Sequence, residues 1–313
     1  MGRRRKGLAI HGWINLDKPL GVTSTQAVGR VKRLFNAAKV GHGGTLDPLA
    51  TGILPIALGE ATKTVAYAMD GEKEYVFTIR FGIETETGDG EGAVSAESDV
   101  RPSDAEITAA LPAFIGEIDQ VPPRYSAIKV DGARAYDLAR GGEDFEMKSR
   151  RVTVLGLTLD SRPDADHAVI RCRSGKGVYV RSLARDLARA LGTVGHVSVL
   201  RRTAVGPFTE KGSISLDNLE ALGHSARDSG HLLPVETALD DIPALALTEA
   251  EARRLAQGQA IAALPVASRS PFKNIRQGDM VSAMLGDRLV ALAEIKGGEI
   301  RPVRVLNLDG PDT

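Results

Sequence analysis

The strongest restriction on the fold of this chain is a glycine-rich segment at residues 41–52, with the sequence GHGGTLDPLATG. Four of its twelve residues are glycine, whereas glycine makes up about 7% of an average protein. This density lets the backbone pass where a Cβ atom would clash, or approach a ligand closely. The segment has no Gly-Lys-Ser/Thr ending and no Gly-x-Gly-x-x-Gly spacing. It is therefore neither a P-loop nor a dinucleotide-binding turn.

One acidic side chain, Asp47, lies in this segment, directly before Pro48. The proline restricts the preceding residue to extended conformations, which limits where the Asp47 carboxylate can lie. The simplest interpretation is an Asx-type turn. The functional interpretation is a carboxylate nucleophile or base held on a rigid loop. His42, in the same segment, favours the second, because a histidine there can bind a substrate or orient the loop.

Hydrophobic spacing predicts strands and helices in an irregular order. Apolar residues alternate with polar ones in the predicted strand 75–81, and an apolar stripe lies beside arginines in the predicted helix 178–191. A polar, acidic insertion at 84–99 is expected to be mobile. Further strands are predicted at residues 13–16, 151–159, 167–172 and 196–205, and a further helix runs from a cap at Thr23 and Ser24 to Phe35. Because strands and helices do not alternate regularly, the predicted fold class is α+β.

The last seventy or so residues show a separate pattern of predicted helix and strands. A helix is predicted at 248–257, and short strands near 279–284, 288–295 and 300–306. At 313 residues the chain is also long for a single core. We therefore expect two domains, residues 1–243 and a small β-rich unit at 244–313.

The net charge of zero, from 40 basic and 40 acidic side chains, conceals a strong pattern. Residues 1–63 carry a net charge of +7 and residues 148–213 of +8, whereas residues 64–147 carry −11 and residues 214–313 carry −4. The balance excludes a polycation, but two basic blocks can fold together into a positive cleft that attracts a polyanion. The alternative is that these charges are solvated faces without a partner.

Cysteine and histidine usage argues against disulfides and metal sites. Cys172 is the only cysteine, so no intramolecular disulfide and no all-cysteine zinc site can form. The remaining histidines lack ligand spacing: His11, His167, His196, His224 and His231. No apolar run reaches eighteen residues, so no membrane span is predicted. We expect a soluble protein of a reducing cytoplasm.

Five motifs, in order, resemble the bacterial tRNA pseudouridine synthase B (TruB) family. The first is GHGGTLDPLATGILPIALGEATK, which begins at Gly41. The others are KEYVF at 73–77, PPRYSAIK at 122–129, GKGVYVRSL at 175–183 and HVSVLRR at 196–202. The resemblance extends from residue 12 to residue 208, about two thirds of the chain.

The resemblance implies an isomerase that converts uridine 55, in the T loop of tRNA, to pseudouridine without a cofactor or an obligate protein partner. It implies a mixed, largely antiparallel central sheet flanked by helices, with an RNA-binding cleft, and a PUA-like RNA-binding domain at the C-terminus. By motif, Asp47 matches the catalytic aspartate, Tyr75 the tyrosine that stacks on the target base, and Arg181 the arginine that pairs with the aspartate. Further positions that match substrate contacts are His42, Tyr179 and Leu200.

Several basic residues are candidates for binding RNA phosphates, a role that needs charge and no sequence information. They are Lys176, Arg201 and Arg202, with Lys18 and Lys63 as lesser candidates.

Two other functions remain open at this stage. A tRNA-binding or tRNA-folding module would use the same basic cleft without catalysis. A nucleoside hydrolase would also place a carboxylate beside an oxocarbenium-like centre. The aspartate itself has three possible roles in an isomerase: addition to C6 of the base, attack at C1′, or removal of the C2′ proton.

Overall fold

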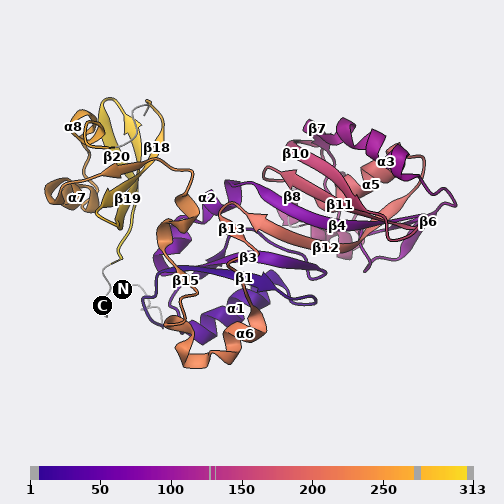
Figure 1. Cartoon of the computed structure of the whole chain (residues 1–313), viewed down its shortest axis with the longest axis horizontal. Coiled ribbons are helices and arrows are strands. Elements are labelled where there is room, and N and C mark those ends of the chain that lie inside the picture. Colours follow the sequence, from indigo (N-terminus) through magenta and orange to yellow (C-terminus); the bar gives the residue numbers. More distant parts are fainter. Residues whose placement is uncertain (1–6, 127, 131, 271–275, 309–313) are drawn as a thin grey trace.

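The computed structural model describes residues 7–126, 128–130, 132–270 and 276–308. The first six residues of the predicted basic block 1–63, including its four basic residues at 3–6, therefore lie outside the described residues. A large sheet covered by helices is followed by a smaller sheet formed by the C-terminal part of the chain (Figure 1). Within the described ranges, no helix is both long and apolar enough to cross a membrane.

The large sheet carries eleven strands among the described residues. These are β1 (Gly12–Lys18), β2 (Val40–His42), β3 (Ala50–Leu58), β4 (Lys73–Phe81), β7 (Gly116–Gln120), β10 (Arg150–Ser161), β11 (His167–Ser174), β12 (Gly195–Val205), β13 (Phe208–Thr209), β14 (Ile214–Ser215) and β15 (Leu232–Leu233). Its main path runs β14-β1-β3-β12-β4-β11-β10-β7, and β2, β13 and β15 pair with β3, β12 and β1. Only β1–β14 and β3–β12 are parallel among these pairs, so the predicted mixed, largely antiparallel sheet is confirmed.

The predicted strand 75–81 is part of β4. Phe77, Ile79 and Phe81 are almost completely buried, whereas Arg80 between them is exposed. The alternation in the sequence therefore corresponds to one face of β4 that packs against the core, as expected for a pattern of period two.

The register of the central strands brings distant parts of the chain together. Leu200 on β12 is opposite Ala50 on β3, and Arg202 is opposite Gly52 on β3 and Tyr75 on β4. Gly52 has a φ of +100°, and a Cβ atom there would lie 2.1 Å from the carbonyl oxygen of Arg202. Only glycine permits this approach, and it sets the glycine-rich segment against β12.

Helices pack on the two ends of the large sheet (Figure 1). They are α1 (Ser24–Phe35), α2 (Val65–Asp70), α3 (Asp104–Ala110), α4 (Ala135–Arg140), α5 (Val180–Ala190) and α6 (Leu216–Ala221), with 3-10 turns η1 (Gly59–Lys63), η2 (Leu111–Phe114), η3 (Gly223–Arg227) and η4 (Val235–Leu239). The predicted cap of α1 is confirmed, because the Thr23 hydroxyl accepts from the Gln26 backbone N–H. In α5 the predicted apolar stripe joins the apolar cluster formed by β4, β10 and β11: Leu183 and Leu187 are buried in it, and Leu191 packs against it half-buried.

The C-terminal part forms a separate five-stranded sheet, so a small β-rich unit is confirmed. In order along the sheet its strands are β16 (Ala244–Ala246), β18 (Met280–Leu285), β19 (Arg288–Lys296), β20 (Glu299–Val305) and β17 (Ile261–Ala262), and its helices are α7 (Glu249–Ala256) and α8 (Ala263–Ala267). Leu289 and Leu292 of β19 share a buried apolar cluster with Trp13 and Phe208 of the large sheet. The division at residues 243 and 244 remains a proposal.

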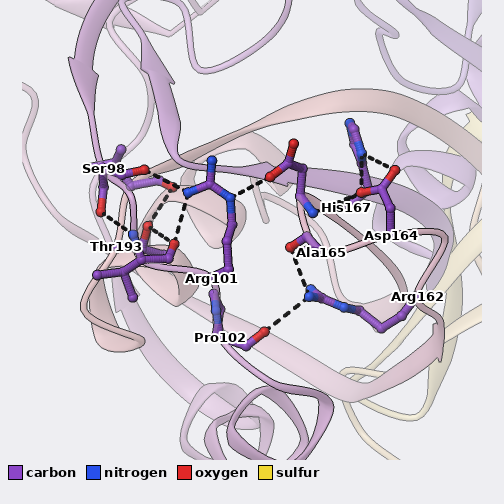
Figure 2. Close-up of polar contacts among 11 residues, drawn as sticks. Ser98, Arg101, Pro102, Arg162, Asp164, Ala165, His167 and Thr193 are labelled. Atoms are coloured by element: carbon purple, nitrogen blue, oxygen red, sulfur yellow. Dashed lines mark hydrogen bonds and ion pairs between the residues drawn. The ribbon is translucent and has the colours of Figure 1, made fainter.

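The acidic insertion at 84–99 differs from the expectation of a mobile segment. It contains an antiparallel hairpin of β5 (Ile83–Thr85) and β6 (Val94–Glu97). Figure 2 shows how the chain after β6 is attached. Arg101 donates hydrogen bonds to the Ser98 carbonyl and to the carboxylate of Asp166, and the Thr193 hydroxyl donates to the Val100 carbonyl. The sequence missed this because all of these partners lie far along the chain or on the backbone. A second short hairpin, β8 (Lys129–Val130) and β9 (Ala133–Arg134), precedes α4.

Candidate active site

Asp47 lies in the loop between β2 and β3, and hydrogen bonds hold this loop on both sides of it. Ser24, the first residue of α1, accepts from the Leu46 N–H at 2.8 Å and donates to the Leu46 carbonyl at 2.9 Å. The Gly21 N–H donates to the Pro48 carbonyl at 2.9 Å. The Asp47 side chain itself stays 42% exposed. The loop therefore presents a carboxylate in a fixed place, as the functional interpretation of this segment requires.

Arg181, in the first turn of α5, joins Asp47 to a second carboxylate. Its Nη2 lies 2.9 Å from Asp47 Oδ2, and its Nη1 lies 3.2 Å from Asp89 Oδ2. The same nitrogens donate to the carbonyls of Thr87 and Tyr125, each at 2.9 Å. The Arg181 side chain is only 7% exposed, so these four acceptors replace its hydration. Of the two carboxylates only Asp89, with its side chain 12% exposed, is itself buried, and removing one partner of a buried pair typically costs about 3–5 kcal/mol.

A cavity of about 490 Å³ opens beside the Asp47–Arg181 pair. Tyr75 from β4, Tyr179 before α5 and Leu200 from β12 line it together with that pair. Small-molecule sites typically enclose about 300–1,000 Å³, so this volume is that of a ligand site, for which the predicted ligand is a nucleobase. We call this space the base cavity. The structure thus brings five of the six residues predicted for catalysis or substrate contact onto one cavity.

His42, the sixth, lines a neighbouring cavity of about 970 Å³ that also reaches Asp47 and Arg181. Its Nδ1 accepts from the Gly44 N–H at 3.3 Å. Burial, with the nearby charge of Arg202, lowers the pKa of His42, so the ring is neutral at pH 7. The bond joins His42 to the backbone of its own glycine-rich segment, and its contact with a substrate stays a prediction.

The prediction that Lys18 contacts a phosphate disagrees with its burial. The residue is fully buried, and its Nζ donates to the carbonyls of Pro19, Val22 and Pro48 at 2.9, 2.7 and 3.4 Å. Burial lowers the pKa of Lys18 to about 8, although the charge of Asp47 opposes the shift. The ammonium group holds the Asp47 loop from inside instead of meeting solvent.

Arg202, also predicted as a phosphate contact, is 2% exposed. Its guanidinium donates to the carbonyls of Ile53 at 2.8 Å, Gly44 at 3.1 Å and Thr45 at 3.4 Å. Because a buried cation needs acceptors in place of water, the carbonyls of the glycine-rich loop and this guanidinium stabilise each other. The position of Arg202 in the interior corrects the prediction.

The other three phosphate candidates reach the surface to different extents. Lys63 forms an ion pair with Glu60 and donates to a backbone carbonyl of β20 at 2.7 Å, so it links η1 to the C-terminal sheet. Arg201 is shared between two carboxylates, Asp17 and Glu210. Lys176, with its side chain 69% exposed, lines the base cavity, and its Nζ forms an ion pair with the Asp70 carboxylate of α2 at 2.7 Å. Of these three side chains that of Lys176 is the most exposed, and its contact with a phosphate stays a prediction.

Asp89 was missed by the sequence analysis. It is 9% exposed, and its Oδ1 accepts from the Thr87 hydroxyl at 2.5 Å and from the Glu91 N–H at 3.1 Å. The residue lies in the acidic insertion, where neighbouring carboxylates give it no distinguishing pattern. Its contact with Arg181 joins residues 92 positions apart, which no local signal reveals.

Among the described residues, no group of three or more histidine, cysteine, aspartate or glutamate side chains is arranged to hold a metal ion. Cys172 is buried, and burial raises the pKa of its thiol to about 12.

Known proteins resemble the chain in sequence and fold. A family profile described as TruB family pseudouridylate synthase (N terminal domain) matches residues 32–180, and one described as tRNA pseudouridylate synthase B C-terminal domain matches residues 181–240. The chain is 60% identical over 310 residues to the tRNA pseudouridine synthase B of Rhodospirillum rubrum, covering 98% of this chain and 100% of that protein. The corresponding protein of Caulobacter vibrioides is 59% identical over 309 residues, with coverages of 98% and 100%.

Two solved structures share the fold. One, an H/ACA RNP bound to a substrate RNA containing 2′-deoxyuridine, has a TM-score of 0.72 at 24% identity and covers 98% of this chain and 92% of that chain. The other, a Cbf5-Nop10-Gar1 complex, has a TM-score of 0.69 at 28% identity, with coverages of 96% and 84%. The first likeness concerns the fold alone.

Proposed function

This chain belongs to the TruB family of pseudouridylate synthases, and on that premise we propose that it isomerises uridine 55 in the T loop of tRNA to pseudouridine. Membership confirms the predicted family and makes the chain an isomerase. The relatives that share 59–60% of its residues carry the name tRNA pseudouridine synthase B, which supports tRNA as the substrate. The observation that carries the proposal is the Asp47–Arg181 pair at the base cavity.

The reaction breaks the N1–C1′ glycosidic bond, rotates the uracil and joins C5 to C1′. N1 gains a proton and C5 loses one, so nothing is added overall and no cofactor is needed. Asp47 can add to C6, attack C1′ or remove the C2′ proton, and each route needs an ionised carboxylate in contact with the nucleotide. A bound nucleotide takes water away from this carboxylate, and the Arg181 guanidinium, at 2.9 Å, supplies an opposite charge and a hydrogen bond in its place.

A uridine inside a folded loop must leave its stack before Asp47 can reach it. Extrusion costs a few kcal/mol, and stacking on an aromatic side chain returns about 1–3 kcal/mol. Tyr75 and Tyr179 line the base cavity from two elements, and Leu200 adds an apolar contact. We propose that these three side chains receive the everted base.

The RNA backbone needs positive charge outside the base cavity. Lys176 is the best placed of the predicted phosphate contacts, because its side chain is exposed at the cavity and its ion pair with Asp70 is open to solvent. We propose that residues 244–313, with their own sheet, form a PUA-like RNA-binding domain that extends this surface. Contacts of this kind make binding sensitive to salt.

One assay separates the three candidate functions. The protein is incubated with T-arm RNA that carries tritium at C5 of the target uridine, and both solvent tritium and free uracil are measured. An isomerase releases tritium without free uracil. Free uracil would indicate the hydrolase, and neither product would indicate a binding module. The Asp47–Arg181 pair leads us to expect tritium alone.

Tyr75→Leu is expected to slow turnover more than it weakens binding. The leucine keeps an apolar side chain on β4 but removes the stacking surface, which is worth about 1–3 kcal/mol per base. We expect kcat to fall by about 10- to 100-fold, with a change in RNA Kd below about fivefold. Single-turnover tritium release and filter binding measure the two.

Tyr67→Leu provides the matched control, because Tyr67 on α2 packs in another apolar cluster and does not line the base cavity. A wild-type rate for Tyr75→Leu would mean that Tyr75 only packs in the sheet and does not act on the base.

A further inference from the structure

Gln120, the last residue of β7, holds the backbone of Tyr179 with both ends of its amide. Its Nε2 donates to the Tyr179 carbonyl at 3.2 Å, and its Oε1 accepts from the Tyr179 N–H at 2.8 Å. The residue is 2% exposed, so water cannot replace either bond. The side chain therefore acts as a piece of strand that pairs with the residue before α5.

The start of α5 depends on this contact, because no side chain caps the helix at Tyr179. The chain that follows Gln120 adds two further ties. The Ser182 hydroxyl donates to the Val121 carbonyl at 2.7 Å, and Arg181 Nη2 donates to the Tyr125 carbonyl at 2.9 Å. The end of β7 and its following loop thus position the first turn of α5.

We propose that Gln120 is a positioning residue of the isomerisation, which fixes Tyr179 and Arg181 relative to Asp47. The inference rests on the proposed function of the Asp47–Arg181 pair. Catalytic groups must be held within about 0.5 Å of their productive positions, and a misplacement of about 1 Å can cost 10²-fold in rate. A rotation of the first turn of α5 would move the Arg181 guanidinium away from Asp47 by such amounts.

Only an amide satisfies both atoms of Tyr179 at every pH. A carboxylate accepts from the N–H but has no proton for the carbonyl, whereas a protonated carboxyl group has both a donor and an acceptor. Gln120→Glu therefore converts the contact into one that depends on its own protonation. Burial raises the pKa of a carboxyl group above its ordinary value of about 4.3, whereas the positive charge of Arg150, opposite Gln120 on β10, acts against that shift.

The test measures kcat of Gln120→Glu relative to wild type from pH 5.5 to 8.5, with T-arm RNA under single-turnover conditions. At pH 8.5 we expect kcat of Gln120→Glu to be about 10- to 100-fold below that of wild type. As the pH falls, kcat should recover toward the wild-type value, with RNA Kd unchanged within about threefold. The charged or titratable groups nearest this position are Arg150 opposite it on β10, Asp119 before it, and Arg185 and Tyr179 of the α5 region. All are present in wild type too, so the ratio cancels their own titration, and their charges affect only the pH at which the introduced carboxyl group gains its proton.

Gln120→Met is the matched control, because it keeps the length of the side chain and makes neither bond at any pH. It should lower kcat by a similar factor at every pH and leave RNA Kd unchanged, and this result alone supports the inference if Gln120→Glu does not fold. A wild-type kcat for Gln120→Glu at pH 8.5, or for Gln120→Met at any pH, would overturn it. Asp47→Asn, assayed in parallel, distinguishes the two failures: activity in that variant removes the proposed function, whereas an inactive Asp47→Asn beside unaffected Gln120 variants removes only this inference.

Discussion

Asp47→Asn should reduce tritium release by at least about 10³-fold, the scale of loss for a group that acts in the chemical step. The amide keeps the shape of the carboxylate but cannot add to the base, attack C1′ or remove a proton. All three routes open to Asp47 therefore predict the same loss. RNA Kd should stay within about tenfold of wild type, a difference of about 1.4 kcal/mol, because Asp47 is one acidic group in a surface that binds a polyanion.

Asp137→Asn is the control for this experiment. Asp137 on α4 lines the same 970 Å³ cavity as Asp47, so both variants lose one negative charge in that cavity. A change in RNA affinity common to the two reports charge, and a loss of turnover confined to Asp47→Asn reports chemistry. Turnover by Asp47→Asn within tenfold of wild type would contradict the proposed function.

The elements that the sequence predicts best are those whose pattern is local. The helix 178–191 is observed as Val180–Ala190, and the strand 75–81 as part of Lys73–Phe81. In both cases one buried face imposes a period that a single segment displays. The glycine-rich segment was equally informative, because Gly52 at a φ of +100° is required by the approach of Arg202.

The burial of two cations could not be predicted from local sequence patterns. Lysine and arginine are almost never fully buried unless paired, so Lys18 and Arg202 were assigned to the surface. In the structure their partners are mainly backbone carbonyls, those of the segment after β1 and of Pro48 for Lys18, and those of the glycine-rich loop and Ile53 for Arg202. The sequence does not indicate which backbone carbonyls point inward, because every residue has a backbone carbonyl.

Asp89 and Gln120 were missed for a related reason. Each contacts the start of α5 from a distant segment, Asp89 through Arg181 and Gln120 through Tyr179. Arg181 was predicted as the partner of Asp47 only through the family resemblance. A hydrogen bond between residues 59 or 92 positions apart leaves no periodic signal in either segment.

Arg181→Lys is the second substitution for which we expect a large effect. The planar guanidinium contacts Asp47, Asp89 and two backbone carbonyls at once, and a lysine ammonium is a point charge that cannot span these acceptors. Lysine that stays near Asp89 leaves Asp47 without its partner, and lysine that follows Asp47 leaves a carboxylate that is 12% exposed without compensation. We expect kcat to fall by at least about 10²-fold, with RNA Kd within about tenfold.

Arg189→Lys tests whether the effect belongs to the pair and not to the helix. Arg189 lies on the same helix, with its side chain 57% exposed and paired with Glu84 at 2.8 Å, and exposed pairs of this kind contribute only about 0–1 kcal/mol. This variant should therefore keep the wild-type rate. If Arg181 acts by keeping Asp47 charged and in place, Arg181→Lys should add little to the loss already caused by Asp47→Asn, because residues that act as a unit are not additive. Fully additive losses in the double variant would mean that Arg181 contributes to turnover by a route that does not pass through Asp47.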